Sequence, residues 1–274
     1  MKLTGKMQKI EFIWKIFLVA LVGASVFGIA SCGVKRDVTQ KNLPELVVGC
    51  DEYAPYAYFG RNNESIGIDI ELAKEVCRRI GRKFVFKQIK WDEKDSCLES
   101  GVVDCVWGAF SMNGREDDYL WAGPYYDSRQ VVVVRDDSGI TKLSELDGKR
   151  VAVQSSTKPE TIFLERSLPN VPNVGKVFSF VHMDETFAAL SRGYVDACSG
   201  HEEAFYYYMR NLPESYRVLA EPVMFSKIGV AFVKGGDAAL ASQVNKALRD
   251  MKDDGTTDNI IKKYTKTMTV TESE

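Results

Sequence analysis

The chain has 274 residues, of which 45% are hydrophobic and 27% charged. It is therefore long enough and apolar enough to bury a substantial core. Acidic residues slightly outnumber basic ones, 38 to 36. This balance argues against a nucleic-acid-binding protein, which would carry a strongly basic surface, and nucleic acid is not an expected partner.

The N-terminus indicates export. Residues 1–15 carry four lysines against one acid, and an apolar run follows over residues 16–30. This run is shorter than the ~20 residues that cross a bilayer comfortably, and such a pattern is typical of a secretory signal. The ending Ile29-Ala30-Ser31-Cys32 resembles the bacterial lipobox, in which the cysteine becomes the lipidated first residue. An uncleaved anchor helix is the alternative, and both interpretations place the rest of the chain outside the cytoplasm, tethered to a bacterial membrane.

A signal peptide over residues 1–31 would remove four of the 36 basic residues and one of the 38 acidic residues. The mature chain then has 32 basic and 37 acidic residues, a net charge of −5. Residues 32–44 are polar and aperiodic, so we expect a lipidated, flexible tether there.

From residue 45 onward, strand and helix patterns alternate. Residues 46–50 form an apolar run that predicts a strand, and residues 84–86 predict another. Between them, apolar residues recur at helical spacing from Asp69 to Ile80, with Asp69 as the expected N-cap and Gly81 as the expected stop. Such alternation predicts an α/β fold with a mostly parallel sheet.

One sequence pattern occurs twice. Residues 98–108 and 190–200 both read L-x-x-G-x-V-D-x-x-x-G, which predicts a helix end, a glycine turn and a strand. Two copies about ninety residues apart indicate two similar lobes, although chance recurrence of a common junction is the alternative. The loop after the first copy carries Arg115, and the loop after the second carries His201. Because ligands bind beyond the carboxyl ends of strands in such sheets, both loops are expected to face a shared cleft.

The later elements complete the predicted organisation. Strands are expected over residues 130–135, 150–154 and 228–233, and two helices follow the last of these. We predict lobe 1 over residues 45–133 plus 228–268, lobe 2 over residues 134–227, and a tail over residues 269–274.

The five cysteines after Cys32 match no zinc pattern, and no metal site is expected. Cys97 and Cys105 would pair if a helix and a strand brought them together. The alternative is that the cysteines are small buried hydrophobes.

Several short motifs follow one another along the chain in a fixed order and spacing. They are GCDEYAPY (49–56), GIDIELA (67–73), GVVD (101–104), Arg115, GPYY (123–126), LDGKRVAVQ (146–154), GYVD (193–196) and DG (254–255). Together they resemble the family 3 extracellular solute-binding proteins, the receptor subunits of polar amino acid ABC importers, over residues 45–266. The resemblance implies a two-lobed, type II periplasmic-binding-protein-like fold, in which each lobe is a mixed sheet flanked by helices and two strands form the hinge.

The resemblance also implies roles for particular residues. Arg115 would fork onto the ligand carboxylate, unless it pairs with Glu116 or Asp117. Aromatic walls would come from Tyr53 and from Trp91, for which ordinary core packing is the alternative. The remaining implied contacts are the hydroxyl of Thr157, the backbone N–H groups of Ser156 and Thr157 and the backbone carbonyl of Gly108.

The chain departs from the family pattern at three places. Phe110 stands where relatives have Thr or Ser, and the loop at residues 51–53 is one residue shorter than in many relatives. His201 stands where an aspartate normally pairs with the ligand ammonium, and a neutral histidine supplies no counter-charge. Glu202 or Glu203 would then substitute, or the ligand is another small carboxylate. A plain helix-start histidine facing water is the alternative for His201.

We therefore expect ligand capture by hinge closure, without catalysis or a cofactor, by a monomer that delivers its ligand to an ABC permease. One alternative is an exported enzyme resembling the cyclohexadienyl dehydratases, with His201, Glu202 or Glu203 as general acid. The other is a module that senses a ligand for a signalling partner.

Overall fold

The computed structural model describes residues 42–210, 212 and 215–266. By its internal contacts the chain divides into Met1–Asn42 and Leu43–Glu274, and all the described strands and helices belong to the second unit. The predicted signal peptide, Cys32, most of the tether and the 269–274 tail lie outside the described residues. Within the described part, no helix is both long and apolar enough to cross a bilayer.

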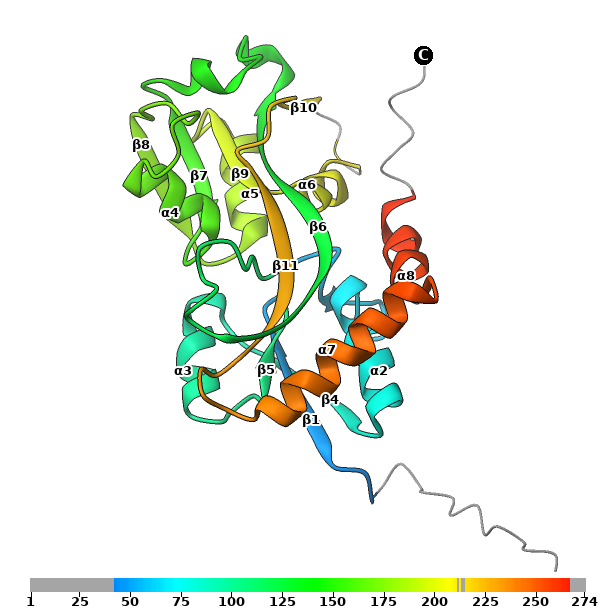
Figure 1. The fold of residues 1–274 in the computed structure, drawn as a ribbon. Coiled ribbons are helices and arrows are strands. Elements are labelled where there is room, and N and C mark those ends of the chain that lie inside the picture. Colours follow the sequence, from blue (N-terminus) through cyan, green and yellow to red (C-terminus); the bar gives the residue numbers. More distant parts are fainter. Residues whose placement is uncertain (1–41, 211, 213–214, 267–274) are drawn as a thin grey trace, which may run out of the picture. The chain divides into compact units, whose positions relative to one another are not determined.

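A curled mixed sheet organises the body of the protein (Figure 1). Its strands are β1 (Glu45–Cys50), β4 (Lys83–Gln88), β5 (Cys105–Val106), β6 (Leu120–Arg135), β7 (Arg150–Gln154), β8 (Lys176–Phe180), β9 (Ala197–His201), β10 (Tyr216–Val218) and β11 (Met224–Phe232). They lie in the order β4-β1-β5-β11-β6-β9-β7-β8, with β10 paired to β6. β2 (Tyr58–Phe59) and β3 (Ser65–Ile66) form a separate hairpin.

The sheet carries a parallel group of strands at each end. β1 lies parallel to β4 and β5, and β7 lies parallel to β8 and β9. The long strands β6 and β11 run antiparallel to each other and connect the two groups. The predicted lobe boundaries at residues 133/134 and 227/228 fall inside these two long strands.

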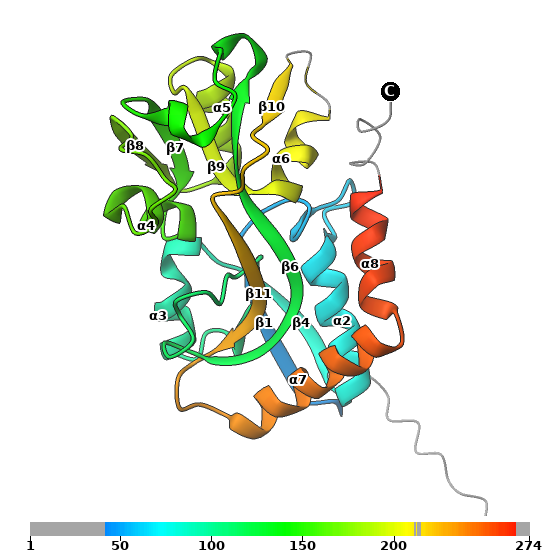
Figure 2. The same cartoon turned by 45° about the horizontal axis from the view of Figure 1, so that its top comes forward.

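Separate sets of helices cover the two ends of the sheet, so the molecule has two lobes (Figure 1). We call β4-β1-β5 with its helices the first lobe and β9-β7-β8 with its helices the second lobe. In the first lobe, α2, α7 and α8 lie side by side, also in the turned view of Figure 2. The helices are α2 (Ile68–Ile80), α3 (Lys94–Glu99), α7 (Ala238–Asp253) and α8 (Thr256–Thr265) in the first lobe, and α4 (Lys158–Glu165), α5 (Met183–Ser191) and α6 (Glu202–Met209) in the second.

The amino-acid pattern accounts for these elements. The run Val131 to Val134 is fully buried on both faces of β6, as expected of a strand between neighbours in a covered sheet. The predicted helix before β4 is confirmed as α2, and Gly81 ends it in the left-handed conformation. The sequence predicted Asp69 as the N-cap of this helix, and that prediction is wrong. Gly67 takes that place, and the Asp69 carboxylate is buried and accepts hydrogen bonds from elsewhere in the chain.

The two copies of the repeated pattern have the same structural role. Gly101 and Gly193 both adopt left-handed backbone, with φ of 69° and 72°, as a tight helix-to-strand turn requires. The side chain of Asp104 accepts a hydrogen bond from the backbone N–H of Val47 at 2.7 Å, next to β5 in the first lobe. In the second lobe the side chain of Asp196 accepts one from the N–H of Arg150 at 2.8 Å. The recurrence therefore marks one structural unit used twice.

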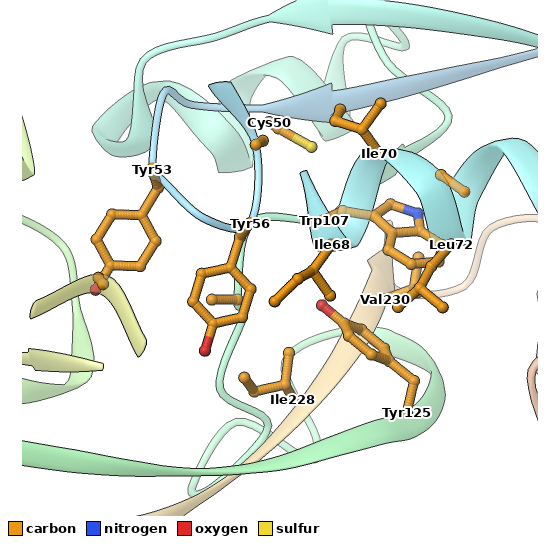
Figure 3. Close-up of a cluster of buried hydrophobic side chains, with 14 of the residues drawn as sticks. Cys50, Tyr53, Tyr56, Ile68, Ile70, Leu72, Trp107, Tyr125, Ile228 and Val230 are labelled. Atoms are coloured by element: carbon orange, nitrogen blue, oxygen red, sulfur yellow. The ribbon is translucent and has the colours of Figure 1, made fainter. Parts of the chain in front are cut away.

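The core of the first lobe packs aromatic and aliphatic side chains between the sheet and α2 (Figure 3). Tyr53 and Tyr56 stand side by side at its edge, with ring centroids 5.7 Å apart and planes 7° from parallel. All five cysteines of the described chain are free thiols, so Cys97 and Cys105 do not pair. Four of the five are buried and serve as small apolar side chains.

Candidate functional site

The carboxyl ends of β1, β5, β7 and β9 converge on one cleft between the lobes, as expected for ligand sites in α/β sheets. The two lobes are in contact across this cleft, and the space left between them for water-sized occupants is ≈ 30 Å³, room for about two or three waters. It is lined by Asp51, Tyr53, Trp91, Gly108, Ala109, Ser111, Arg115, Gln130, Gln154, Thr157, Lys158, Pro159, Met183, Ser199, Gly200 and His201.

Several hydrogen bonds between described residues cross the cleft and join the lobes. The Trp91 indole Nε1–H donates to the carbonyl of Ser156 at 3.2 Å. The Gln154 amide donates to one Asp51 carboxylate oxygen at 2.8 Å. The backbone N–H of His201 donates to the Tyr53 hydroxyl at 3.1 Å. A larger occupant requires that some of these bonds open.

Arg115 comes from a loop whose backbone is fixed from behind. Buried Asp69 accepts hydrogen bonds from the N–H groups of Gly108 and Ala109, each at 2.8 Å, and from the Tyr125 hydroxyl at 2.7 Å. Gly108 has a φ of 106°, which glycine adopts readily, whereas the φ of 51° at Ala109 is unfavourable for a residue with a side chain, and the Asp69 carboxylate helps to hold it. Asp69 thereby positions the start of the segment that leads to Arg115.

The Arg115 guanidinium is poorly bonded for a half-buried cation. It donates only long hydrogen bonds of 3.4 Å to the carbonyls of Ser111 and Ser156, and it lies 5.3 Å from the centre of the Phe110 ring. In the described chain it forms no ion pair, with Glu116, Asp117 or any other acid. Burial lowers the pKa of this guanidinium. The group is therefore available to an anion in the cleft.

Asp51 follows β1 directly, and its carboxylate is 4% exposed. Gln154 donates to one oxygen, whereas the other, Oδ1, is buried without a hydrogen-bond partner. Burial is the main reason that its pKa rises to about 6. The side-chain oxygen of Gln130, on β6, is likewise buried and unpartnered. Two acceptors in the cleft lining thus lack donors.

His201, at the end of β9, is 6% exposed and uncharged at neutral pH, because burial lowers its pKa to about 3. Its Nε2 lies 2.8 Å from the Gln130 amide nitrogen, and its Nδ1 lies 3.0 Å from the Ser128 hydroxyl. Because the Gln130 NH₂ group can only donate, Nε2 accepts and Nδ1 carries the proton. Both ring nitrogens therefore have partners within the protein.

The two glutamates after His201 have other partners. Glu202 forms an ion pair with Arg129, whose Nε donates to it at 2.8 Å. Glu203 is buried and accepts hydrogen bonds from Tyr56, Tyr126 and Ser128 at 2.6 to 2.7 Å. Neither lines the cleft, so Asp51 is the acid among the lining residues of the described chain. No His, Cys, Asp and Glu cluster of the described residues is suited to a metal ion.

The model of the bacterial extracellular solute-binding proteins, family 3, matches residues 46–267 of the chain. The chain belongs to this family. The predicted resemblance is thereby confirmed.

Among curated family relatives, the L-cystine-binding protein TcyA of Bacillus subtilis (strain 168) is 28% identical over 267 residues, which span 91% of this chain and 97% of TcyA. A solved structure of an ancestral arginine-binding protein bound to arginine is 30% identical, with a TM-score of 0.72 over 80% of this chain and 97% of that one. The ancestral amino acid-binding protein AncCDT-1, a precursor of cyclohexadienyl dehydratase, is 29% identical. Its structure has a TM-score of 0.71 over 80% of this chain and 95% of AncCDT-1. These likenesses confirm the predicted two-lobed fold class.

Within this family 3 fold, the structure brings most of the predicted site residues together. Those that line the cleft are Tyr53, Trp91, Gly108, Arg115, Thr157 and His201. Trp91 lines the cleft and also belongs to a core cluster, so it is both an aromatic wall of the cleft and a core residue. His201 does not face water. The Thr157 hydroxyl donates to the Gln154 carbonyl at 2.6 Å.

Three predicted residues do not line the cleft. Phe110 is fully buried behind it, against Trp91, Tyr119 and Trp121. The N–H of Ser156 donates to Glu160, so only its carbonyl faces Arg115 and Trp91. Glu202 is occupied by Arg129.

Sequence reasoning missed six polar lining residues, Asp51, Ser111, Gln130, Gln154, Lys158 and Ser199. Asp51 directly follows the predicted strand at 46–50, Gln154 ends the predicted strand at 150–154, and Lys158 lies four residues beyond that end. The position at a strand's carboxyl end was the available signal.

Proposed function

We propose that this protein captures an amino acid or a related compact carboxylate outside the cytoplasm and delivers it to an ABC importer. One observation carries the proposal. A guanidinium, Arg115, and a carboxylate, Asp51, line the same closed cleft, and neither has a charged partner there. The cleft is therefore complementary to a small molecule that carries both a negative and a positive group.

Arg115 binds the ligand carboxylate in this proposal. A guanidinium donates two parallel, charge-assisted hydrogen bonds to a carboxylate, a match that lysine cannot reproduce. The bonds that Arg115 makes within the protein are long, so exchanging them for a carboxylate gains more than it loses. The Ser156 carbonyl, which both Arg115 and Trp91 face, is the group that an incoming carboxylate displaces.

Asp51 accepts hydrogen bonds from the ligand ammonium in this proposal. The sequence predicted Glu202 or Glu203 for that role. The free oxygen of Asp51 and the free oxygen of Gln130 are buried acceptors, and such groups cost stability unless a donor reaches them. Neutral His201 has both nitrogens engaged and supplies no counter-charge. The cationic end of the ligand therefore lies toward β1 and Asp51.

Closure of the two lobes follows ligand binding in this proposal. The lining groups come from both lobes, and only the closed arrangement brings them together. A ligand that contacts both sets favours the closed state by its differential affinity. The hinge consists of β6 and β11, the strands that pass between the lobes. We propose that the first lobe comprises residues 45–133 plus 228–268 and the second lobe residues 134–227.

Delivery requires a position next to the membrane permease. The lipobox-like sequence before Cys32 supports a lipid anchor on the extracytoplasmic face, and the polar residues 32–44 support a flexible tether. Anchorage of this kind needs more than one acyl chain, because a single chain binds only marginally. We propose that the anchored protein acts as a monomer.

A second candidate function is an exported dehydratase-like enzyme. The pKa of Asp51 rises to about 6, which suits a general acid better than an ordinary aspartate does. Prephenate turnover by the purified protein tests this function. Product formation that disappears in Asp51→Asn would favour the enzyme over the transport receptor.

Calorimetric titration tests the proposed function directly. The full chain, purified in a non-ionic detergent, is titrated with the L-amino acids, their des-amino analogues and their decarboxylated amines. We expect certain amino acids to bind, Arg115→Ala to weaken them at least about thirtyfold, and amines without a carboxylate not to bind. Arg192→Ala is the control, because this side chain is exposed and has no ion-pair partner in the described chain. Unchanged affinity in Arg115→Ala would overturn the proposal.

A further inference from the structure

The cleft contains a second cation that the proposed function leaves without a role. Lys158, the first residue of α4, lines the cleft from the second lobe. Its Nζ reaches the loop of the first lobe so closely that a Cβ placed on Gly114 would lie 2.9 Å from it. Gly114 directly precedes Arg115, so two positive side chains from opposite lobes meet at one end of the cleft.

Acids of the described chain act on these two cations only from beyond ion-pair distance. In the described chain, neither Lys158 nor Arg115 has an acid within ion-pair distance, and no hydrogen bond is formed by the Lys158 ammonium. The acids that act on Lys158 are Glu116, Glu165 and Asp118, all of them outside the cleft lining. Burial and the charge of Arg115 both lower the pKa of Lys158. Two like charges held together in this way are unfavourable until an anion joins them.

We propose that Arg115 and Lys158 together form a site for two carboxylates, so that the ligand is a dicarboxylic amino acid. This inference rests on the proposed function and specifies its ligand. Arg115 takes one carboxylate in a fork, and Lys158 takes the other as a compact point charge. The single ammonium of the ligand lies toward Asp51 and the free oxygen of Gln130. Lining charges of two positive and one negative then match a ligand with two negative and one positive group.

The position of Lys158 also explains when this site forms. Because Arg115 and Lys158 belong to different lobes, opening the cleft separates them and relieves their repulsion. A ligand with two carboxylates bridges them in the closed state, whereas a ligand with one carboxylate leaves one cation uncompensated. The second carboxylate therefore adds to closure as well as to affinity.

The test compares ligands that differ only in this charge. The full chain in detergent is titrated with L-glutamate and L-aspartate, and with their amides L-glutamine and L-asparagine. We expect the wild type to bind the acids at least about tenfold more tightly than the amides. Lys158→Gln should abolish this preference while amide binding persists, and Lys158→Arg should largely restore it. Lys149→Gln removes an exposed charge at the opposite end of β7 and should change nothing.

The outcomes separate the two proposals. If amides bind at least as tightly as acids in the wild type, or if Lys158→Gln keeps the preference, the dicarboxylate inference is wrong and the amino acid receptor stands. If a folded wild type binds neither acids nor amides nor any other amino acid, the proposed function itself is wrong.

Discussion

Gln154 donates to one oxygen of Asp51 across the cleft and leaves the other oxygen without a partner. The contact joins the ends of β7 and β1, one from each lobe. Asp51 is thus half satisfied by the protein, which is unusual for a carboxylate that is 4% exposed. A buried carboxylate oxygen without a donor destabilises the folded protein, and such groups are typical of functional sites.

Asp51→Asn should stabilise the protein at neutral pH and weaken ligand binding. The pKa of Asp51 is about 6 in the folded state and 3.8 in a model compound, so the folded state holds its proton more tightly. Stability is therefore lost as pH rises from about 4 to 6, on the order of 2 to 3 kcal/mol in total. Asparagine removes this loss and keeps an acceptor for Gln154.

Urea denaturation of the wild type and of Asp51→Asn at pH 7.5 and pH 4 measures this effect. The variant should gain stability at the higher pH and gain little or nothing at the lower one. An equal change at both values, or a loss at pH 7.5, would show that the Asp51 charge does not strain the fold.

The repeated pattern shows what the sequence alone could predict. The glycine of each copy makes the turn within its own helix–turn–strand unit, and the aspartates Asp104 and Asp196 both accept a hydrogen bond from the neighbouring parallel strand. Local spacing and strand periodicity therefore predicted β1, β4, β7 and α2 and the cleft-facing loop of Arg115, whereas His201, expected in a loop, ends strand β9.

Partners from distant parts of the chain could not be predicted in this way. Glu202 stands next to His201, but its charge is taken by Arg129, 73 residues away on β6. Asp69 has the sequence context of an N-cap, yet it holds the loop at Gly108. Whether an acid is available to the cleft depends on whether a donor from a distant part of the chain already binds it. A local sequence pattern does not contain that information.

His201 should make the protein less stable in acid. The pKa of His201 is about 3 in the folded state, against an ordinary value of 6.5. Between these pH values the imidazole is protonated in the unfolded chain and neutral in the folded chain. Stability is therefore lost as pH falls below 6.5, by about 1.4 kcal/mol per pH unit down to about pH 3. The groups that face the ring, Ser128, Gln130, Tyr53 and Tyr56, are uncharged in this range, although Glu203 lies behind Ser128.

Denaturation of His201→Gln between pH 7 and pH 4 measures this contribution. Its stability should fall less steeply with acid than that of the wild type, whatever its absolute value at pH 7. His182→Gln, at an exposed position, is the matched comparison because it replaces the chain's other histidine. Parallel pH profiles for wild type and His201→Gln would contradict a buried neutral imidazole.

Phe110→Thr should destabilise the protein rather than restore a hydroxyl partner for the ligand. The sequence resemblance implied a hydroxyl contact at this position, but Phe110 is fully buried here, edge-on to Trp91, Tyr119 and Trp121 at 4.9 to 5.1 Å between ring centroids. Loss of a buried phenyl ring costs about 3 to 5 kcal/mol, and a threonine hydroxyl among these rings adds an unpaired polar group.

Denaturant unfolding and calorimetry on Phe110→Thr check both halves of this prediction. Stability should fall by about 3 kcal/mol or more, whereas Phe225→Thr, at a side chain 70% exposed, should change it by less than about 0.5 kcal/mol. Binding should not tighten, because the Phe110 ring supports the Arg115 guanidinium from 5.3 Å. A stable variant with tighter amino acid binding would mean that the side chain at this position reaches the cleft after all.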